Sequence, residues 1–327
     1  MSRLVLHIGT HKTATTRIQK LFARNRPLLA RHGVIFPRIG AEDGQHALVG
    51  LWNSLLLPSP DFDAANAWQE LIDRHAGSSA TLFVSSEEFS RMNARKVDMA
   101  ALAALAAAFD EVLVLCTLRN QASFLQSVYQ QISRSRPPED WDAFFARMIE
   151  RRMADGLTLD YSRLYSHLLR GFRRNQIRLI SYDTETPRPG GVVGAYLDAL
   201  GLPLAPGDLA PVADTEANIS PQPLATFTAN WLARPDPPPP GLVVLMQSHI
   251  DRNFGPGLRT SLLTRQEVAR IDEIFTPTNV ALSERIRPYQ ADFSIGPMLA
   301  DGVDIYREDL TGAFWIDVCR SLAGAVA

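Results

Sequence analysis

The sequence predicts an α/β fold: a central, P-loop-like parallel sheet flanked by helices, with a helical C-terminal lid or subdomain. The first observation is a series of short apolar runs, such as residues 4–8, with the length and β-branched content of buried strands. The second is that segments with apolar residues at helical spacing lie between these runs. Such alternation of strand and helix is typical of a parallel sheet covered on both faces. A chain of 327 residues is long enough to bury a sizeable core.

The expected elements place polar residues at one edge of the sheet. We expect strands over residues 4–8, 34–36, 81–84, 112–118 and 177–181. We expect helices over residues 15–31, 65–75, 99–109, 123–134, 141–152, 161–170 and 192–200. Ligands of such sheets bind at the carboxyl ends of the strands. Lys12, Glu87 and Arg119 follow strands, so we expect the functional site there.

The texture of the sequence changes after about residue 202. Pro, Ala and Asp become frequent over residues 203–211, and the Pro-rich run 235–240 predicts a stiff spacer. Further helices are expected over residues 223–233, 242–249, 265–275 and 278–286. We therefore interpret residues 1–202 as the core and residues 203–327 as a helical part of the same domain.

Composition narrows the class of function. The formal net charge of −2 gives no global basic field for nucleic acid or anionic membrane. No apolar run approaches the length of a membrane span, and residues 4–8 are too short for a signal peptide. Of the two cysteines, Cys116 lies in a predicted buried strand, which disfavours a disulfide framework. We expect a cytoplasmic protein without integral membrane contact and without a nucleic-acid partner.

The first candidate motif is the loop between strand 4–8 and a helix that begins near Thr15. A strand, a loop of small residues and a helix cradle phosphate, because the free N–H groups and the positive end of the helix dipole face the anion. Lys12 adds a full charge. Hydroxyl donors come from Thr13, Thr15 and Thr16. A Walker A loop is not present, because His11 precedes Lys12 and Gly9 is the only glycine of the loop.

The second candidate motif follows strand 112–118. Arg119 stands at its end, where a magnesium-binding acid would be expected in a nucleotide triphosphatase. Ser127 follows eight positions later inside a predicted helix. The guanidinium can grip a phosphate through two parallel hydrogen bonds, and the serine hydroxyl can close the other side. This pattern suits an anion bound by direct cationic contacts without a metal.

Together the two motifs resemble the sulfotransferase family. Residues 12–16, Lys-Thr-Ala-Thr-Thr, look like its 5′-phosphosulfate loop, which is usually Lys-Thr/Ser-Gly-Thr-Thr. Arg119 and Ser127 look like its 3′-phosphate motif. Similarity to the bacterial carbohydrate-type branch extends over residues 28–37, 46–48, 160–165, 177–183 and 218–220. Ala14 stands where the family usually has Gly, and alanine fits unless this residue needs a positive φ.

The resemblance implies a donor, a product and their binding residues. The donor is 3′-phosphoadenosine 5′-phosphosulfate (PAPS), and the product is adenosine 3′,5′-bisphosphate. Backbone N–H groups of Thr13, Ala14, Thr15 and Thr16 would hold the 5′ end, while Arg119 and Ser127 would hold the 3′-phosphate. His11 could touch the donor, and Arg259, in a Gly-rich late loop, could reach the 3′-phosphate. No metal is implied, and no set of His, Cys, Asp and Glu has metal-ligand spacing.

Sulfuryl transfer assigns roles to three residues. As in phosphoryl transfer, the protein mainly positions groups and neutralises charge, and Lys12 is the candidate beside the leaving oxygen. The acceptor hydroxyl needs a base, for which the family uses His or Glu. His46, between a Gly-rich turn and an expected helix over residues 47–56, is the first candidate. Glu87 is the second, although Glu87 and Glu88 also fit a helix capping box.

We therefore expect a PAPS-dependent sulfotransferase that acts on a hydroxyl-bearing acceptor, with carbohydrate or glycolipid as the favoured class. Two alternatives stay open at this stage. One is a P-loop phosphotransferase or nucleotide hydrolase, which would require magnesium and a triphosphate. The other is a non-catalytic nucleotide-binding or glycan-binding module that binds without turnover.

Overall fold

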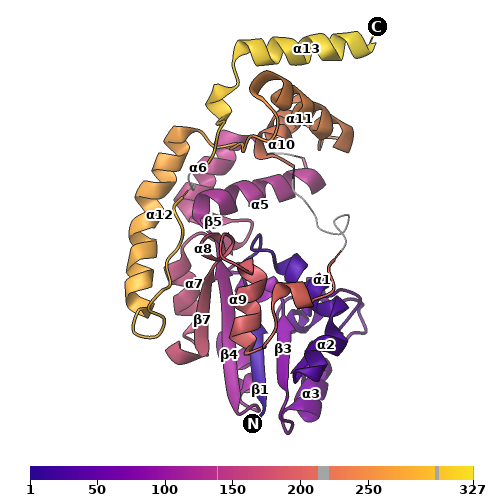
Figure 1. Cartoon of the computed structure of the whole chain (residues 1–327), viewed down its shortest axis with the longest axis vertical. Coiled ribbons are helices and arrows are strands. Elements are labelled where there is room, and N and C mark those ends of the chain that lie inside the picture. Colours follow the sequence, from indigo (N-terminus) through magenta and orange to yellow (C-terminus); the bar gives the residue numbers. More distant parts are fainter. Residues whose placement is uncertain (138, 213–220, 299–301, 327) are drawn as a thin grey trace. The chain divides into compact units, whose positions relative to one another are not determined.

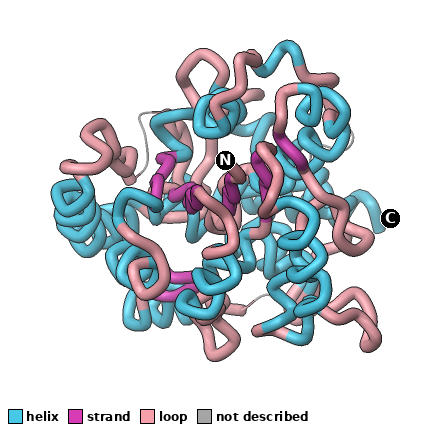
Figure 2. The backbone as a smooth tube through the Cα atoms, turned by 90° about the horizontal axis from the view of Figure 1, so that it is seen from below, coloured by secondary structure: helices cyan, strands magenta, loops and turns pink. Residues whose placement is uncertain are grey.

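The fold is built on a five-stranded parallel sheet with the strand order β2-β3-β1-β4-β7. The computed structural model describes residues 1–137, 139–212, 221–298 and 302–326. The strands of the sheet are β1 (Arg3–His7), β2 (Val34–Ile35), β3 (Thr81–Ser85), β4 (Glu111–Leu118) and β7 (Ile177–Ser181). Figure 1 labels four of them side by side, and Figure 2, seen from below, shows the strands in one row. The α/β prediction is thereby confirmed.

β1 lies in the middle of the sheet and pairs with β3 on one side and β4 on the other. Leu4 lies opposite Leu82 and Val112, and all three side chains are buried. The next residue of β1, Val5, points to the other face and is buried as well. Both faces are therefore covered, which explains why the strands read as continuous apolar runs rather than alternating ones.

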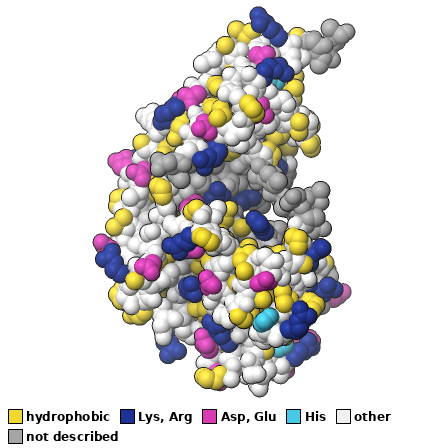
Figure 3. Space-filling model, viewed as in Figure 1, with side chains coloured by type: hydrophobic (Ala, Val, Ile, Leu, Met, Phe, Trp, Pro, Cys, Tyr) yellow, Lys and Arg dark blue, Asp and Glu magenta, His cyan; other side chains and the backbone are white. Residues whose placement is uncertain are grey.

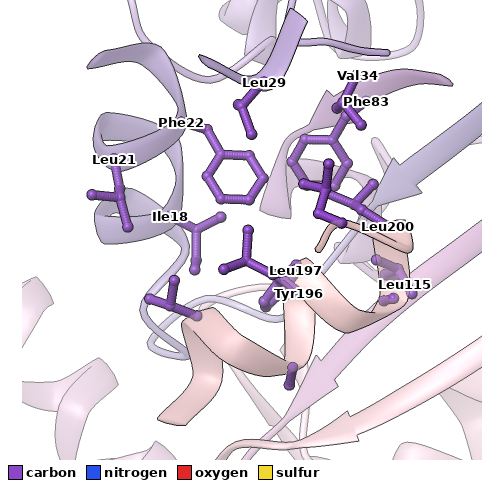
Figure 4. Close-up of a cluster of buried hydrophobic side chains, with 14 of the residues drawn as sticks. Ile18, Leu21, Phe22, Leu29, Val34, Phe83, Leu115, Tyr196, Leu197 and Leu200 are labelled. Carbon is purple, nitrogen blue, oxygen red and sulfur yellow. The ribbon is translucent and has the colours of Figure 1, made fainter. Parts of the chain in front are cut away.

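One face of the sheet packs against α1 (Thr15–Arg24), α2 (Arg26–Arg31) and α9 (Gly191–Leu200). Figure 4 shows Phe22, Phe83 and Tyr196 in this core. The Phe22 and Phe83 ring centroids are 5.2 Å apart, and Phe83 also meets Tyr196 edge-on. Because α1 is held on the sheet by this cluster, its N-terminus has a fixed place at the carboxyl end of β1.

The remaining elements are mostly helical. The further α-helices are α3 (Ala64–His75), α4 (Met99–Ala106), α5 (Gln121–Ser135), α6 (Trp141–Arg151), α7 (Tyr161–Leu168), α8 (Tyr182–Glu185), α10 (Pro223–Ala233), α11 (Pro240–Phe254), α12 (Arg265–Ile286) and α13 (Gly312–Val326). The 3-10 helices are η1 (His46–Leu51), η2 (Ser54–Leu56), η3 (Glu87–Ser90), η4 (Arg174–Gln176), η5 (Pro206–Asp208) and η6 (Arg307–Asp309), and the short strands are β5 (Met153–Ala154) and β6 (Leu157–Thr158).

Two expected helices have a different form in the structure. The segment 15–31 is two helices, because the chain turns at Asn25, and Pro27 lies in the first turn of α2, where its missing N–H costs nothing. The segment 47–56 is not an α-helix but the 3-10 helices η1 and η2.

Near the C-terminus, by contrast, two expected helices are joined into one. The two helices expected over residues 265–275 and 278–286 are one continuous helix, α12, which runs through Pro277. The structure also contains α13, the short helix α8 and the strands β5 and β6, which were not expected from the sequence.

The chain divides into two compact units that do not follow a single cut in the sequence. The first contains Met1–Arg119, Asp155–Asn218 and Thr278–Gly296, and therefore the whole sheet. The second contains Asn120–Ala154, Ile219–Pro277 and Pro297–Ala327. Its core is formed by apolar residues of α10, α11 and α13. The boundary at residue 202 stays a prediction.

The surface carries charges of both signs. Figure 3 shows Lys and Arg interspersed with Asp and Glu over the visible face, in keeping with the net charge of −2. Within the described parts of the chain, no helix combines the length and the apolar composition that a membrane crossing requires.

Candidate functional site

The candidate site lies in the first unit, at the carboxyl ends of the neighbouring strands β3, β1 and β4. Backbone pairing continues past the last residue of β1, because Ile8 N donates to Leu115 O and Thr10 N donates to Thr117 O. On the other side, Ser86 N donates to His7 O. The loop that follows β1 thus starts from a position fixed by both neighbouring strands.

The loop between β1 and α1 contains two non-glycine residues in the left-handed region, Lys12 with φ 65° and Ala14 with φ 63°. The condition under which alanine was expected not to fit is therefore met at residue 14. A left-handed conformation costs a residue with a Cβ roughly 1–2 kcal/mol. The Thr13 hydroxyl donates to Thr10 O at 2.5 Å and the Thr15 hydroxyl to the same oxygen at 3.5 Å, and these bonds hold the loop in shape.

The N-terminus of α1 is suited to an anion. Ala14 is its N-cap residue and offers no side-chain acceptor, and the first turn contains no acidic residue. The first N–H groups of the helix therefore have no side-chain cap to satisfy them. Thr13 and Thr15 are buried, whereas Thr16 is exposed and Lys12 is half-buried. The loop thus combines uncapped helix donors with one lysine charge.

Arg119 follows β4 and lies directly beside this loop. Its Nη1 donates to the backbone oxygen of Lys12 at 3.3 Å. Its guanidinium lies over the Tyr182 ring, 5.0 Å from the ring centroid, and its Nε is 4.0 Å from Asp183 Oδ1. Tyr182 and Asp183 were not expected from the sequence to be partners of Arg119. Their position directly after β7, the strand beside β4, is a signal that could have found them.

The two acids after β3 have separate environments. Glu88 forms an ion pair with Arg91, and its Oε1 lies 3.4 Å from His11 Nε2. Glu87 instead accepts a hydrogen bond from Gln19 Nε2 of α1 at 3.1 Å. The capping interpretation is correct for part of this segment, because the Ser86 hydroxyl accepts from Glu88 N.

His46 and Glu87 lie together. His46 Nδ1 is hydrogen-bonded to the Ser86 hydroxyl at 2.7 Å and is 4.0 Å from Glu87 Oε2, while its Nε2 is 3.6 Å from Glu42 Oε2. Both side chains are mostly buried, with 17% of His46 and 14% of Glu87 exposed. The two residues that the sequence offered as alternative bases are thus neighbours, and the geometry does not separate their roles.

His11 and His7 are buried near the site and differ from His46 in their surroundings. Burial lowers the pKa of His11 well below 6.5, and the nearby positive charges of Arg91, His46 and Lys12 lower it further. Burial also lowers the pKa of His7 to about 3, with a smaller contribution from His46. Both imidazoles are therefore neutral near pH 7. His11 can donate a hydrogen bond to an anion but carries no positive charge.

Two predicted residues belong to the second unit. Ser127 is half-buried in α5. Arg259 is exposed; its N–H donates to Asp304 Oδ2 at 2.8 Å, and its guanidinium packs against Gly302. The resemblance at residues 218–220 falls outside the described residues. Over the described residues, no group of three or more His, Cys, Asp or Glu side chains is arranged to hold a metal ion.

The comparisons with known proteins find likenesses among solved structures. No protein-family model and no curated protein matches the chain. Among solved structures, a sulfotransferase from Alicyclobacillus acidocaldarius is similar with a TM-score of 0.43 and 15% sequence identity, over 83% of this chain and 95% of that one. A TM-score below 0.5 does not establish common ancestry or function. The function is therefore inferred from the residues of the site.

Proposed function

We propose that this protein is a sulfotransferase that moves the sulfuryl group of PAPS to an acceptor hydroxyl. The observation that supports this best is the convergence of three strand ends. Lys12 after β1, Arg119 after β4 and Glu87 after β3 lie at one edge of the sheet, and Arg119 contacts the Lys12 loop. An anion-binding loop, a guanidinium and a base are the groups that sulfuryl transfer requires.

The residues of the loop fit the 5′ end of the donor. The uncapped N–H groups of Thr13, Ala14, Thr15 and Thr16 would bind its oxygens, and His11 would add a neutral hydrogen-bonding group. Arg119 would bind the 3′-phosphate through its guanidinium, which Tyr182 and Asp183 orient. Ser127 and Arg259, which belong to the second unit, stay predictions from the sequence.

The donor supplies a sulfuryl group attached to a phosphate leaving group. The acceptor oxygen forms a bond to sulfur, while the bond from sulfur to the bridging oxygen breaks and its electron pair stays on that oxygen. Lys12 stabilises the charge that develops there. The acceptor proton goes to His46 or Glu87, which act as a pair because they are 4.0 Å apart. Ser86 holds His46, and Gln19 holds Glu87.

A magnesium-dependent phosphotransferase would use the same edge differently. It would need carboxylate oxygens open to a metal, whereas both oxygens of Glu88 face Arg91 and one oxygen of Glu87 accepts from Gln19. The hydroxyl-bearing acceptor stays undetermined, with carbohydrate as the class that the sequence resemblance favours.

The first test is calorimetric titration of adenosine 3′,5′-bisphosphate without magnesium, beside ATP with magnesium. We expect the bisphosphate to bind and Arg119→Ala to weaken it by about 10- to 100-fold, because a charge-assisted hydrogen bond is lost. Arg24→Ala is the matched control: it removes a positive charge from the other end of α1, roughly 14 Å away, and should leave binding unchanged.

The outcomes separate the alternatives. Binding of ATP–magnesium alone would identify a phosphotransferase. Tight bisphosphate binding with no turnover of PAPS against any hydroxyl would identify a binding module. Once an acceptor is known, Lys12→Ala should lower kcat by about 100-fold or more, and a variant with full activity would exclude the leaving-group role.

A further inference from the structure

A chain of buried hydrogen bonds runs beneath the candidate site and ends on Glu87. It begins at the Thr117 hydroxyl of β4, which bonds to the Tyr196 hydroxyl of α9. The Tyr196 hydroxyl lies 2.6 Å from His7 Nε2, and His7 Nδ1 lies 2.8 Å from the Ser85 hydroxyl. The chain then passes to α1, because Gln19 Nε2 is 3.2 Å from the Ser85 hydroxyl and 3.1 Å from Glu87 Oε2.

The direction of the bond to Glu87 follows from its chemistry. A carboxylate oxygen accepts, so the amide of Gln19 has its nitrogen, not its oxygen, toward Glu87. The nitrogen also donates toward Ser85, whose hydroxyl and backbone oxygens lie 3.2 and 3.4 Å away. His7 is neutral, so one of its ring nitrogens donates and the other accepts, and its two hydroxyl partners fit either tautomer.

The Gln19 amide and the His46 ring both lie beside Gly44. A Cβ at Gly44 would be 2.6 Å from Gln19 Nε2 and 2.6 Å from His46 Nε2, so a side chain there would displace the ends of both. Glu87 Oε2 lies 3.1 Å from Gln19 Nε2 and 4.0 Å from His46 Nδ1.

We propose that Gln19 is a positioning residue for the transfer reaction, which holds the Glu87 carboxylate against His46. This inference rests on the proposed function. Because Gln19 stands on α1, one turn after the N-terminus that would bind the donor, one rigid helix would set both the donor and the base. Gln19 would act through Glu87 without touching the reacting atoms.

The variants separate hydrogen bonding from packing. Gln19→Leu keeps the approximate volume and removes the donor, whereas Gln19→Lys restores a nitrogen donor. Gln69→Leu is the matched control, since Gln69 also donates to a carboxylate, Asp73 of α3, but on the exposed surface. Calorimetry with adenosine 3′,5′-bisphosphate checks that the donor site is intact in each variant.

The first readout is release of the bisphosphate from PAPS with water as the acceptor. We expect Gln19→Leu to slow it by about 10- to 100-fold with less than a twofold change in bisphosphate affinity, and Gln19→Lys to recover most of the rate. Equal rates for the Leu and Lys variants, or a loss of affinity as large as the loss of rate, would overturn the proposal.

The second readout needs no turnover. The ring resonances of His46, recorded by NMR at fixed pH, should move in Gln19→Leu in the same direction as in Glu87→Gln and by at least half as much. If only Glu87→Gln moves them, Gln19 does not position the carboxylate. If the wild type binds no bisphosphate, the sulfotransferase proposal fails, and the NMR comparison still decides whether Gln19 holds Glu87.

Discussion

Because His7 is buried, we expect the protein to lose stability in mild acid. Burial lowers its pKa from 6.5 to about 3 in the folded protein, while the unfolded chain keeps the ordinary value. As the pH falls below 6.5, the unfolded state therefore binds a proton that the folded state refuses. The sign follows from linkage: the contribution of His7 is fully present above pH 6.5 and is lost as the pH falls toward 3.

The magnitude can be worked out from these two values. One proton bound only by the unfolded chain lowers the free energy of unfolding by about 1.4 kcal/mol per pH unit. Between pH 7 and pH 5, His7 should therefore remove about 2 kcal/mol. The lowered pKa of His11 means that His11 also takes up a proton on unfolding, so the test has to be a difference between two proteins.

The assay is urea unfolding of the wild type and of His7→Gln at pH 7, 6 and 5. The variant should be less stable at pH 7, because it disturbs the bonds to Ser85 and Tyr196, but it should lose about 2 kcal/mol less on acidification. In the wild type, the His7 ring resonances should not titrate between pH 8 and pH 5. Parallel stability curves for the two proteins, or a His7 resonance that titrates near pH 6.5, would refute the reasoning.

Three further predictions concern single side chains. Ala14→Gly should raise the free energy of unfolding by roughly 0.5–1 kcal/mol in urea titrations, because relief of the left-handed conformation outweighs the added chain entropy; a lower value would mean that φ 63° is unstrained. Asn25→Ala should lower it by about 3 kcal/mol, since the buried amide of Asn25 bonds twice to Ala210 and once within α1; a loss below about 1 kcal/mol would contradict this. Burial raises the pKa of Cys116 to about 12, so a thiol reagent should label exposed Cys319 at once and Cys116 only in urea; Cys319→Ser should abolish the rapid phase.

The strands could be predicted from the sequence because they are buried on both faces. Each of the runs 4–8, 81–84 and 112–118 is mostly apolar, and no exposed residue interrupts it. Helix ends were harder, because they depend on contacts that local spacing does not contain. The break after α1 depends on Asn25 bonding to Ala210, a residue 185 positions away. The segments 265–275 and 278–286 are expected as separate helices on either side of Pro277, whereas α12 runs through this proline.

The residues of the candidate site likewise differ in whether local sequence is enough to place them. Lys12, Glu87 and Arg119 could be placed at one edge because each comes soon after the end of a strand, and parallel strands end together. Gln19 could not be found in this way, since it is a mid-helix residue whose spacing marks it only as one of the side chains that face the sheet. Its meaning comes from Ser85 and Glu87, which lie 66 and 68 positions further along the chain. A buried polar group among apolar residues of a helix or strand has to find a hydrogen-bond partner. Gln19 and His7 both find one in the Ser85 hydroxyl.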